Sequence, residues 1–516
     1  MKSSSQSEGF RAIDPVTGKA LEPEYFDARL RDIDAACRLA SEAAEELRHF
    51  SGERIQSLLE AIAVSLEGER DAIVERCRLE TGYPAERVEG EFLRMVGGMR
   101  LFGGAARRGD WLDVRIDHGD DLRKPVPKPD LRRMKVPLGP VVVFGASNFP
   151  LALSVAGSDV ASALAAGCPV VAKGHPSHPG TSERIALAVA EGVGAAGFPP
   201  GTFAMVQGSS NEVGQALVEH PEVRAVAFTG SLAGGRAIFN LAARREVPIP
   251  VFAEMGSVNP QFVYPGLVGS DAAGFAERLH ASATMGNGQF CTNPGLVFVA
   301  GDDASRVIDA YRAVAREYTG AAMLNTGILR AFRAGIEGWR TVTGLEILED
   351  GELVAEAEIG SAAVVGRISL DDYLQAAPTL QEEVFGPATL FIECGSPDAF
   401  LGAARGIGGQ LGASLHGTEA DLETKEAREL WAFLGSFAGR VLVNAFPTGL
   451  EACDAMQHGG PFPATTDSHW TSVGTAAIER FGRPLAYQGV PDALLPDALK
   501  ESNPLGLRRL VDGQWE

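Results

Sequence analysis

The sequence predicts an α/β protein built around a parallel sheet, with a second α/β domain after it. From residue 140 onward, short apolar runs alternate with helix-length segments, as in strands that are buried on both faces of a parallel sheet. Polar and glycine residues follow these runs, at the strand ends where such sheets bind ligands. At 516 residues the chain is also long enough for two or three domains.

The composition is that of a globular protein with a strong negative charge. Hydrophobic residues make up 45%, and the net charge is −21, so we expect no binding to nucleic acid or to an anionic membrane. The 6 cysteines include no Cys-x-x-Cys pair, so we expect neither a disulfide framework nor a metal site. With no signal peptide visible at the N-terminus, we expect a reducing, cytoplasmic location.

The first domain is predicted to comprise residues 1–111 and 139–253. Its N-terminal part has apolar residues at helical spacing, and its remainder alternates between strand and helix. The first set of expected helices is 31–48, 53–67, 70–81 and 84–103. The expected strands are 141–144, 170–173, 204–207, 225–229 and 251–253. The helices between them are 152–166, 182–195, 211–219 and 234–244, the third preceded by a capping box at Ser209-x-x-Glu212.

The rest of the chain is predicted to form three further parts. Residues 254–445 are a second α/β domain, with a strand at 262–264 and a helix at 272–283. Residues 446–483 are Gly-, Pro- and Thr-rich loops near a substrate mouth. Residues 112–138 are an extended excursion, and the strand-like segment 484–490 pairs either with it or with another subunit.

Polar residues cluster at the ends of the predicted strands of the first sheet. Asn148 follows the first strand, Lys173 ends the second, and Glu254 follows the fifth. The segment Thr229-Gly-Ser231 opens a glycine loop to Gly235 that precedes a helix, which is an arrangement suited to a phosphate. Each of these residues has an alternative explanation as a turn or cap, but together they indicate a nucleotide site that Lys173 also reaches.

Cys291 lies in the Gly-rich turn Met285-Gly-Asn-Gly-Gln-Phe-Cys-Thr292. A free cysteine is most often a small buried apolar residue. A thiol in flexible backbone also suits a nucleophile that a substrate must approach closely. Both interpretations remain open on the residues alone.

In order along the chain, these stretches resemble the aldehyde dehydrogenase superfamily from about residue 11 to 490. The resemblance rests on Ala146-Ser-Asn-Phe-Pro150, Lys173, Phe228-Thr-Gly-Ser231 with Gly235, Glu254-Met-Gly-Ser-Val-Asn-Pro260, Gly288-Gln-Phe-Cys291 and Glu383-Val-Phe-Gly-Pro387. It implies a Rossmann-type cofactor domain, a catalytic domain and an oligomerisation excursion. It also implies assembly as a homodimer or homotetramer through 112–138 and 484–490.

The resemblance implies a role for each matching residue. Cys291 would attack the aldehyde carbonyl as a thiolate, with Asn148 and the Cys291 N–H holding the oxyanion. Glu254 would activate water to release the acid, and its apolar neighbours suggest a raised pKa. The implied cofactor residues are Lys173 and Glu383 at the two riboses, Gly230, Ser231 and Gly235 at the pyrophosphate, and Phe385 and Ser147 nearby.

Departures from the family pattern bear on the cofactor. Many members have a glutamate three residues after the lysine, where it binds the adenosine 2′-hydroxyl. Here Lys173 is followed by Gly-His-Pro176, so no acid would repel a 2′-phosphate. We therefore expect NADP, with NAD possible. His175 is a candidate contact to the phosphate, although a plain surface loop is the alternative for both His175 and His178.

The segment His458-Gly-Gly-Pro-Phe-Pro-Ala-Thr-Thr466 replaces the family's usual C-terminal pattern. It looks like the branch that oxidises 2-oxoglutarate semialdehyde (2,5-dioxopentanoate), which also contains NADP-dependent fatty-aldehyde enzymes. A distal carboxylate needs a cation, and Arg480 and Arg483 are candidates, with a structural ion pair as the alternative. A long chain needs an apolar funnel, and Phe149 and Phe462 are candidates for its wall.

Two further hypotheses belong to other classes. One is a nucleotide-binding homologue that has lost catalysis, against which the joint presence of Cys291, Glu254 and Asn148 argues. The other is acyl transfer to coenzyme A or phosphate, against which a water-activating Glu254 argues. The leading hypothesis remains NAD(P)-dependent oxidation of a small aldehyde to its acid.

Overall fold

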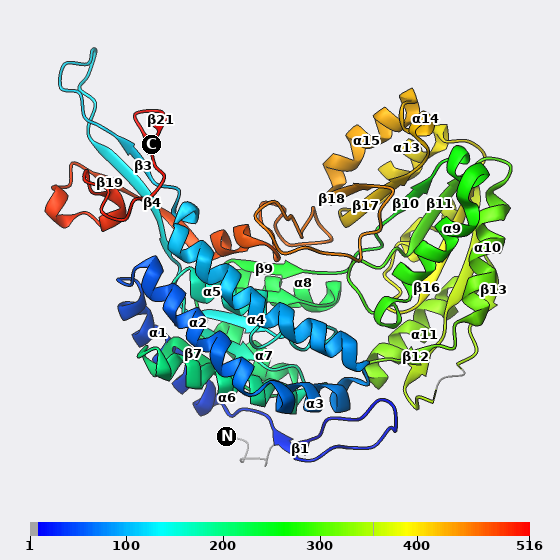
Figure 1. The fold of residues 1–516 in the computed structure, drawn as a ribbon, viewed down its shortest axis with the longest axis horizontal. Helices are drawn as coiled ribbons and strands as arrows, with labels where there is room; N and C mark the ends of the chain where they lie inside the picture. The colour runs from blue at the N-terminus through cyan, green and yellow to red at the C-terminus, as the bar shows by residue number, and fades with distance from the viewer. Residues whose placement is uncertain (1–8, 354–355) are drawn as a thin grey trace.

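The computed structural model describes residues 9–353 and 356–516. Within them, three sheets dominate the architecture, and the first is a parallel sheet in the order β7-β6-β5-β8-β9 (Figure 1). Its strands are β5 (Val141–Phe144), β6 (Val170–Lys173), β7 (Phe203–Val206), β8 (Ala225–Thr229) and β9 (Val251–Glu254). The predicted α/β fold and its parallel sheet are therefore confirmed.

Helices cover both faces of this first sheet because alternate strand residues point to opposite sides. Val141 and Val143 pack in one apolar core, whereas Val142 packs in another. The first core contains residues of α2 (Gly52–Gly68), α4 (Ala85–Arg108), α5 (Ser158–Ala165) and α6 (Pro179–Ala195). The second contains residues of α1 (Leu30–Leu47), α7 (Asn211–Glu219) and α8 (Leu232–Ala243). α3 (Arg70–Thr81) follows α2. Each of the four N-terminal helices begins within two residues of its predicted first residue.

Two predictions in this domain are wrong. The helix expected at 152–166 begins only at Ser158, because the Glu91 carboxylate accepts hydrogen bonds from the Leu151 and Ala152 N–H groups at 2.8 and 3.0 Å and holds 150–157 in turns. The capping box at Ser209 is also absent. Ser209 and Ser210 instead donate to Asp27, and Ser210 occupies the N-cap of α7 without a side-chain cap bond.

The second large sheet has the order β13-β15-β16-β11-β10-β17-β18. Its strands are β10 (Gln261–Val263), β11 (Leu296–Ala300), β13 (Glu346–Asp350), β15 (Val364–Ser369), β16 (Ala388–Cys394), β17 (Gln410–His416) and β18 (Ala438–Val443). One face packs with α9 (Pro265–Ala283) and α10 (Ala304–Glu317). The other packs with α11 (Thr326–Arg340), α12 (Leu370–Leu380), α13 (Asp398–Arg405) and α15 (Lys425–Phe437). The predicted helix at 272–283 is the second part of α9, which has a break at Asp271.

The third sheet forms an arm that projects at the opposite end of the molecule from the second sheet (Figure 1). It contains β3 (Arg115–Asp117), β4 (Leu131–Pro137), β19 (Gly482–Gln488), β20 (Leu510–Val511) and β21 (Gln514–Trp515). β19 pairs antiparallel with β4, so the segment at 484–490 joins the excursion of its own chain. The short strands β20 and β21 were not predicted.

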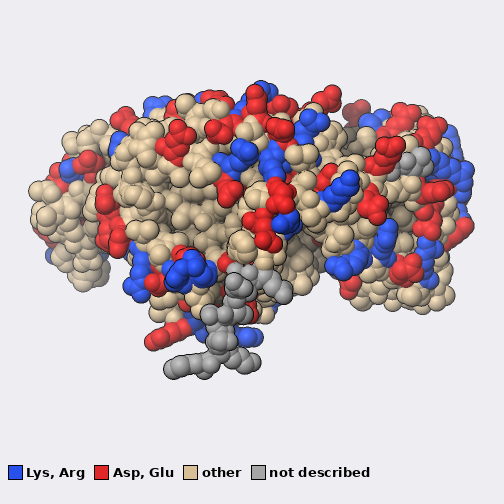
Figure 2. Space-filling model, turned by 90° about the horizontal axis from the view of Figure 1, so that it is seen from below, with Lys and Arg blue, Asp and Glu red and all other residues tan. Residues whose placement is uncertain are grey.

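The loops at 446–474 cross between the two large sheets. Met255 donates its N–H to the Ala464 carbonyl at 2.7 Å, and Thr466 donates to the Ala253 carbonyl at 3.0 Å. These bonds tie a late part of the chain to the end of β9. Acidic and basic side chains lie intermixed over the face in Figure 2. In the part of the chain that the structure describes, no helix is both long and apolar enough to cross a membrane.

Candidate active site

Cys291 lies in a loop whose backbone only certain residues can adopt. The preceding turn η3 (Met285–Gly288) has positive φ at Gly286, Asn287 and Gly288. A Cβ on Gly288 would lie 2.2 Å from the Gly386 backbone, so the Cys291 loop and the loop after α12 touch directly. Asn287 donates through Nδ2 to the Ala321 carbonyl at 2.8 Å, which secures the turn.

Asn148 is fixed against this loop. Its Nδ2 donates to the Gln289 carbonyl at 2.9 Å, and a primary amide carries two N–H groups, so one remains for a ligand. Its own backbone carbonyl accepts from Arg87 Nη2 at 2.8 Å and from the Tyr83 hydroxyl at 3.2 Å. Asn148 and Cys291, which are 143 positions apart in the sequence, are thereby held at one site.

Glu254 ends β9 and faces Cys291 together with His458, a residue that the sequence analysis did not select. The Cys291 Sγ lies 3.6 Å from His458 Nε2, and that nitrogen lies 3.0 Å from Glu254 Oε1. His458 and Glu254 are 2% and 4% exposed, and Ser472 Oγ donates to the other carboxylate oxygen of Glu254. The sequence feature that could have identified this histidine is the departure from the family's usual pattern at residue 458.

The electrostatics of the three groups are coupled. Burial raises the pKa of the Cys291 thiol well above its usual range, and the charges of Glu254 and Glu383 raise it further. Burial also acts to raise the pKa of Glu254, but the charge and hydrogen bonds of His458 and the Ser472 hydroxyl outweigh it, so the net shift is downward. The expected raised pKa of Glu254 is therefore wrong, because His458 and Ser472, which are distant in sequence, outweigh the effect of burial.

Cys291, His458 and Glu254 each offer a ligand atom, and these atoms lie within 4.8 Å of one another. Thiolate, imidazole and carboxylate are all ligands that zinc accepts. The sequence predicts no metal site, and that stays a prediction.

The predicted cofactor residues gather at the carboxyl edge of the first sheet. Lys173 at the end of β6 donates through Nζ to the Gly208 carbonyl at 2.5 Å, and burial lowers its pKa to about 8. Ser231 caps α8 by accepting from the Gly234 N–H at 3.2 Å, while Gly230 and Ser231 are exposed. A Cβ on Gly235 would lie 2.6 Å from the Met255 side chain. The exposed N-terminus of α8 and Lys173, each at the carboxyl end of a strand of this sheet, fit an anionic nucleotide.

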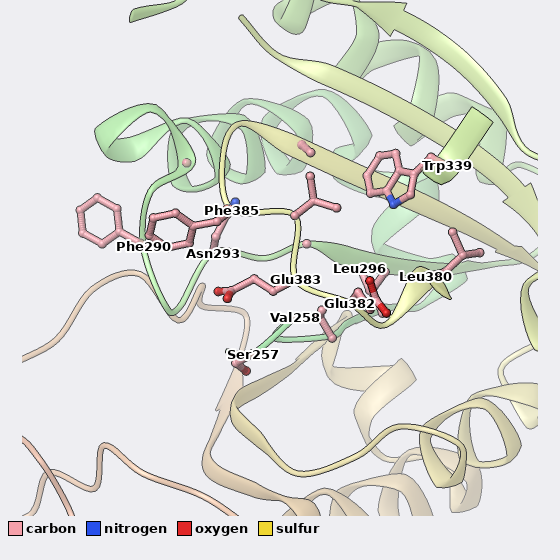
Figure 3. Close-up of a pocket in the computed structure, with 14 residues that line it drawn as sticks. Ser257, Val258, Phe290, Asn293, Leu296, Trp339, Leu380, Glu382, Glu383 and Phe385 are labelled. Atoms are coloured by element: carbon pink, nitrogen blue, oxygen red, sulfur yellow. The ribbon is translucent and has the colours of Figure 1, made fainter. Parts of the chain in front are cut away.

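Glu383 lines a pocket together with Ser257, Phe290, Asn293 and Phe385 (Figure 3). Its carboxylate points away from Trp339 and Leu380, which line the other end. Burial and the Glu254 charge raise the pKa of Glu383 to about 8, against a hydrogen bond from the Ser257 backbone that lowers it. A carboxyl group in this position suits a ribose hydroxyl.

The histidines after β6 are not a plain surface loop. His178 is buried, with Nε2 3.1 Å from the Ala146 carbonyl, and its ring stacks on His175 at 5.4 Å. Burial lowers the pKa of both rings, so they are neutral at neutral pH. Ser147 is partly buried beside Asn148.

A cavity opens above Cys291, which we call the Cys291 cavity. Its wall comprises parts of α4, the 149–158 turns and the C-terminal loops, and includes Arg94, Met95, Phe102, Phe149, Ser158, Phe290, Cys291, Leu450, His458 and Val473. Phe149 is thus at the predicted place, with its ring 4.9 Å from that of Phe290.

The other three predicted substrate residues do not line the Cys291 cavity. Arg480 is buried in an ion pair with Asp159 at 2.6 Å, which was the structural alternative considered for it. Arg483 is on β19 in the arm. Phe462 is 57% exposed, and its ring lies 5.5 Å from the Arg236 guanidinium carbon.

Comparison with known proteins identifies the family. The sequence matches the aldehyde dehydrogenase family over residues 1–461. The chain belongs to the aldehyde dehydrogenase family. It is an NAD(P)-dependent enzyme that oxidises aldehydes.

Similar proteins include two dehydrogenases whose names state a substrate. The chain is 45% identical to alpha-ketoglutaric semialdehyde dehydrogenase 2 of Azospirillum brasilense, over 98% of this chain and 96% of that one. It is 43% identical to alpha-ketoglutaric semialdehyde dehydrogenase of Acinetobacter baylyi, over 95% and 92%.

Solved structures of other aldehyde dehydrogenases share the fold. A 1-pyrroline-5-carboxylate dehydrogenase from Thermus with bound NAD has a TM-score of 0.79 at 21% identity, over 93% of this chain and 90% of that chain. A 3,6-anhydro-L-galactose dehydrogenase in complex with NADP has a TM-score of 0.79 at 20% identity, over 93% and 96%. Both likenesses concern the fold alone.

Proposed function

We propose that this aldehyde dehydrogenase oxidises 2-oxoglutarate semialdehyde to 2-oxoglutarate, with NADP as its preferred cofactor. The identity of 43–45% to two enzymes named for that substrate, over nearly the whole chain, carries the choice of substrate. The alternative within the family is a long-chain aldehyde, which the apolar wall of the Cys291 cavity would also admit.

The chemistry begins at Cys291 and His458. His458 accepts the thiol proton at Nε2, and the imidazolium that forms carries the charge that lowers the pKa of Glu254, whose Oε1 is 3.0 Å away. This ion pair offsets the burial that opposes thiolate formation. The thiolate then forms a C–S bond with the aldehyde carbon, and its carbonyl oxygen becomes an oxyanion.

Asn148 and the loop backbone hold that oxyanion. The amide N–H of Asn148 that does not bond Gln289 and the backbone N–H of Cys291 are the donors. The bound nicotinamide supplies the hydride acceptor. Lys173, the N-terminus of α8 and Glu383 would hold the cofactor. The carbon attached to Cys291 would lose its hydride to the nicotinamide as the oxyanion returns to a carbonyl, which leaves a thioester.

Hydrolysis then needs a base beside the thioester. Glu254 takes a proton from water, whose oxygen attacks the thioester carbon, and the C–S bond breaks to return Cys291 and release the acid. A lowered pKa keeps Glu254 ionised at neutral pH and therefore able to accept this proton. Acyl transfer to coenzyme A would not require a base that activates water, so the presence of Glu254 favours hydrolysis.

The proposed preference for NADP rests on the segment after Lys173. Pro176 stands where many family members have an acid, so nothing at that position repels a 2′-phosphate. Because His175 is neutral, its contribution is limited to a hydrogen bond.

Initial rates test the proposal. NADPH and NADH formation would be measured with 2,5-dioxopentanoate, succinate semialdehyde and a long-chain aldehyde, using wild type, Cys291→Ala and the control Cys453→Ala. We expect 2,5-dioxopentanoate with NADP to give the highest kcat/KM, Cys291→Ala to be inactive and Cys453→Ala to match wild type. A higher kcat/KM for the long-chain aldehyde would contradict the substrate, and a higher kcat/KM with NAD would contradict the cofactor.

A further inference from the structure

The Cys291 cavity has an apolar wall with one permanent charge. Arg94, on α4, is the single lining residue with a permanent charge among the described residues that form the wall. Most of its neighbours in the wall are aliphatic or aromatic side chains, such as Met95, Phe102 and Phe149. Such a wall suits the methylene groups of a substrate, and it strengthens any electrostatic interaction within it.

Arg94 is positioned by the protein, and no carboxylate of the described residues forms an ion pair with it. Its Nη2 donates to the Leu450 carbonyl at 2.6 Å, which fixes the guanidinium at the border between α4 and the C-terminal loops. Within the described residues it forms no ion pair with a carboxylate, although the chain carries a net charge of −21 and 67 acidic residues. By contrast, Arg100 and Arg108 on the same helix are both ion-paired.

The loop that meets Arg94 is itself held in place. Arg440 on β18 donates through Nη1 to the Gly449 carbonyl at 2.7 Å and through Nη2 to the Pro447 carbonyl. Thr448 in this loop shares a hydrogen bond with Ser282 at 2.7 Å. Arg94 therefore lies against a loop that is itself held in place. Its guanidinium is exposed and has several N–H groups that can bind a ligand.

The cavity wall has a second polar group, and this one makes no hydrogen bond among the described residues. The Ser158 hydroxyl is shielded from solvent and makes no hydrogen bond among the described residues. A shielded polar atom without a partner costs free energy unless a ligand or water satisfies it. The cavity thus offers one cation and one neutral donor along its wall, with Cys291 as its nucleophile.

We propose that Arg94 binds the carboxylate of a semialdehyde whose aldehyde group reacts at Cys291, and so selects carboxylated aldehydes over neutral ones. The inference rests on the proposed function, because it names the residue that recognises that substrate's distal end. A guanidinium binds a carboxylate through charge-assisted hydrogen bonds. This role falls to Arg94 in place of Arg480 and Arg483, which lie elsewhere.

The test compares two aldehydes of equal chain length. The readout is the ratio of kcat/KM for 2,5-dioxopentanoate to kcat/KM for pentanal, measured for wild type, Arg94→Gln and Arg107→Gln. Glutamine removes the charge but keeps an amide N–H for the Leu450 carbonyl. Arg107 is an exposed arginine on the same helix, outside the cavity, so its variant controls for the loss of one positive charge.

We expect the ratio to fall about ten- to a hundredfold in Arg94→Gln, mainly through KM for 2,5-dioxopentanoate, and to stay at the wild-type value in Arg107→Gln. Arg94→Lys should recover part of the ratio. A high wild-type ratio that Arg94→Gln leaves unchanged would overturn the inference and leave the proposed function intact. A wild-type ratio near one, with active enzyme, would instead refute the proposed substrate and the inference together.

Discussion

At the scale of single residues, the site depends on groups whose charge is set by neighbours distant in sequence. His458 lies 167 positions from Cys291, and it touches both the thiol and Glu254. The residues to which the family pattern assigns the chemistry could be proposed from local motifs. The direction of the Glu254 pKa was not, because it depends on His458 and Ser472.

Replacing His458 should slow formation of the Cys291 thiolate. In His458→Ala, we expect kcat/KM to fall about a hundredfold or more, because the thiol loses its nearest proton acceptor. Alkylation of Cys291 by iodoacetamide, followed from pH 6 to 10, should shift to higher pH.

His469→Ala is the matched control, since His469 is an exposed histidine of the same loop region that pairs with Asp467. Unchanged alkylation at every pH in His458→Ala would show that His458 does not take the thiol proton.

The Glu383 carboxyl should make stability depend on pH. Its pKa is raised to about 8 in the folded protein, so the folded state binds a proton that the unfolded state releases at lower pH. The stability contribution is complete below the unfolded pKa, and it is lost as pH rises to about 8. Denaturant unfolding of the cofactor-free enzyme should therefore show a steeper loss of stability between pH 5 and 8 in wild type than in Glu383→Gln.

Glu382→Gln removes the neighbouring exposed carboxylate and should keep the wild-type slope. Parallel pH profiles for wild type and Glu383→Gln would mean that Glu383 is ionised throughout.

At the scale of elements, tight turns carry the reactive groups and neighbouring elements hold them. The turns at 150–157 are fixed by Glu91 of α4, and the Cys291 loop is fixed by its contact with Gly386. α4 thus contributes both to the support of Asn148 and to the wall of the Cys291 cavity.

Gly288→Ala should disrupt the Cys291 loop. The residue has φ of 68°, where a side chain costs about 1–2 kcal/mol, and its Cβ would meet backbone at 2.2 Å that cannot move aside cheaply. We expect a Tm lowered by several degrees and a large loss of activity.

Gly338→Ala is the control, because Gly338 is in α11 and nothing lies within 4 Å of its Cβ position. We expect it to raise stability by about 0.5–1 kcal/mol. Equal Tm values for the two variants would contradict this account of the loop.

At the scale of the whole molecule, the arm is the proposed interface of a homodimer or homotetramer. It projects from the body (Figure 1). Its hairpin exposes Leu122 and Val126 at 86% and 58%. β19 and β18 are edge strands of their sheets, with unpaired backbone groups that a second chain would satisfy.

Light scattering after size-exclusion chromatography tests this assembly. We expect wild type to be an oligomer, and Leu122→Ser with Val126→Ser to shift it toward monomer, because apolar contacts of the arm are lost. Leu187→Ser, at a 67% exposed site on α6, should leave the mass unchanged. A monomeric wild type at working concentration would refute the assembly.

The sequence by itself determined the parallel sheet, the N-terminal helices and the family, because these depend on periodicity and on short motifs that are local in the chain. Only the tertiary structure decided that Arg480 is an ion-pair partner of Asp159, and that Arg94 faces the Cys291 cavity. Both are arginines on helical segments, and nothing in their local sequence distinguishes them. Long-range packing decides whether a charge is neutralised by the protein or presented to a ligand, and the same packing brings His458 to Cys291.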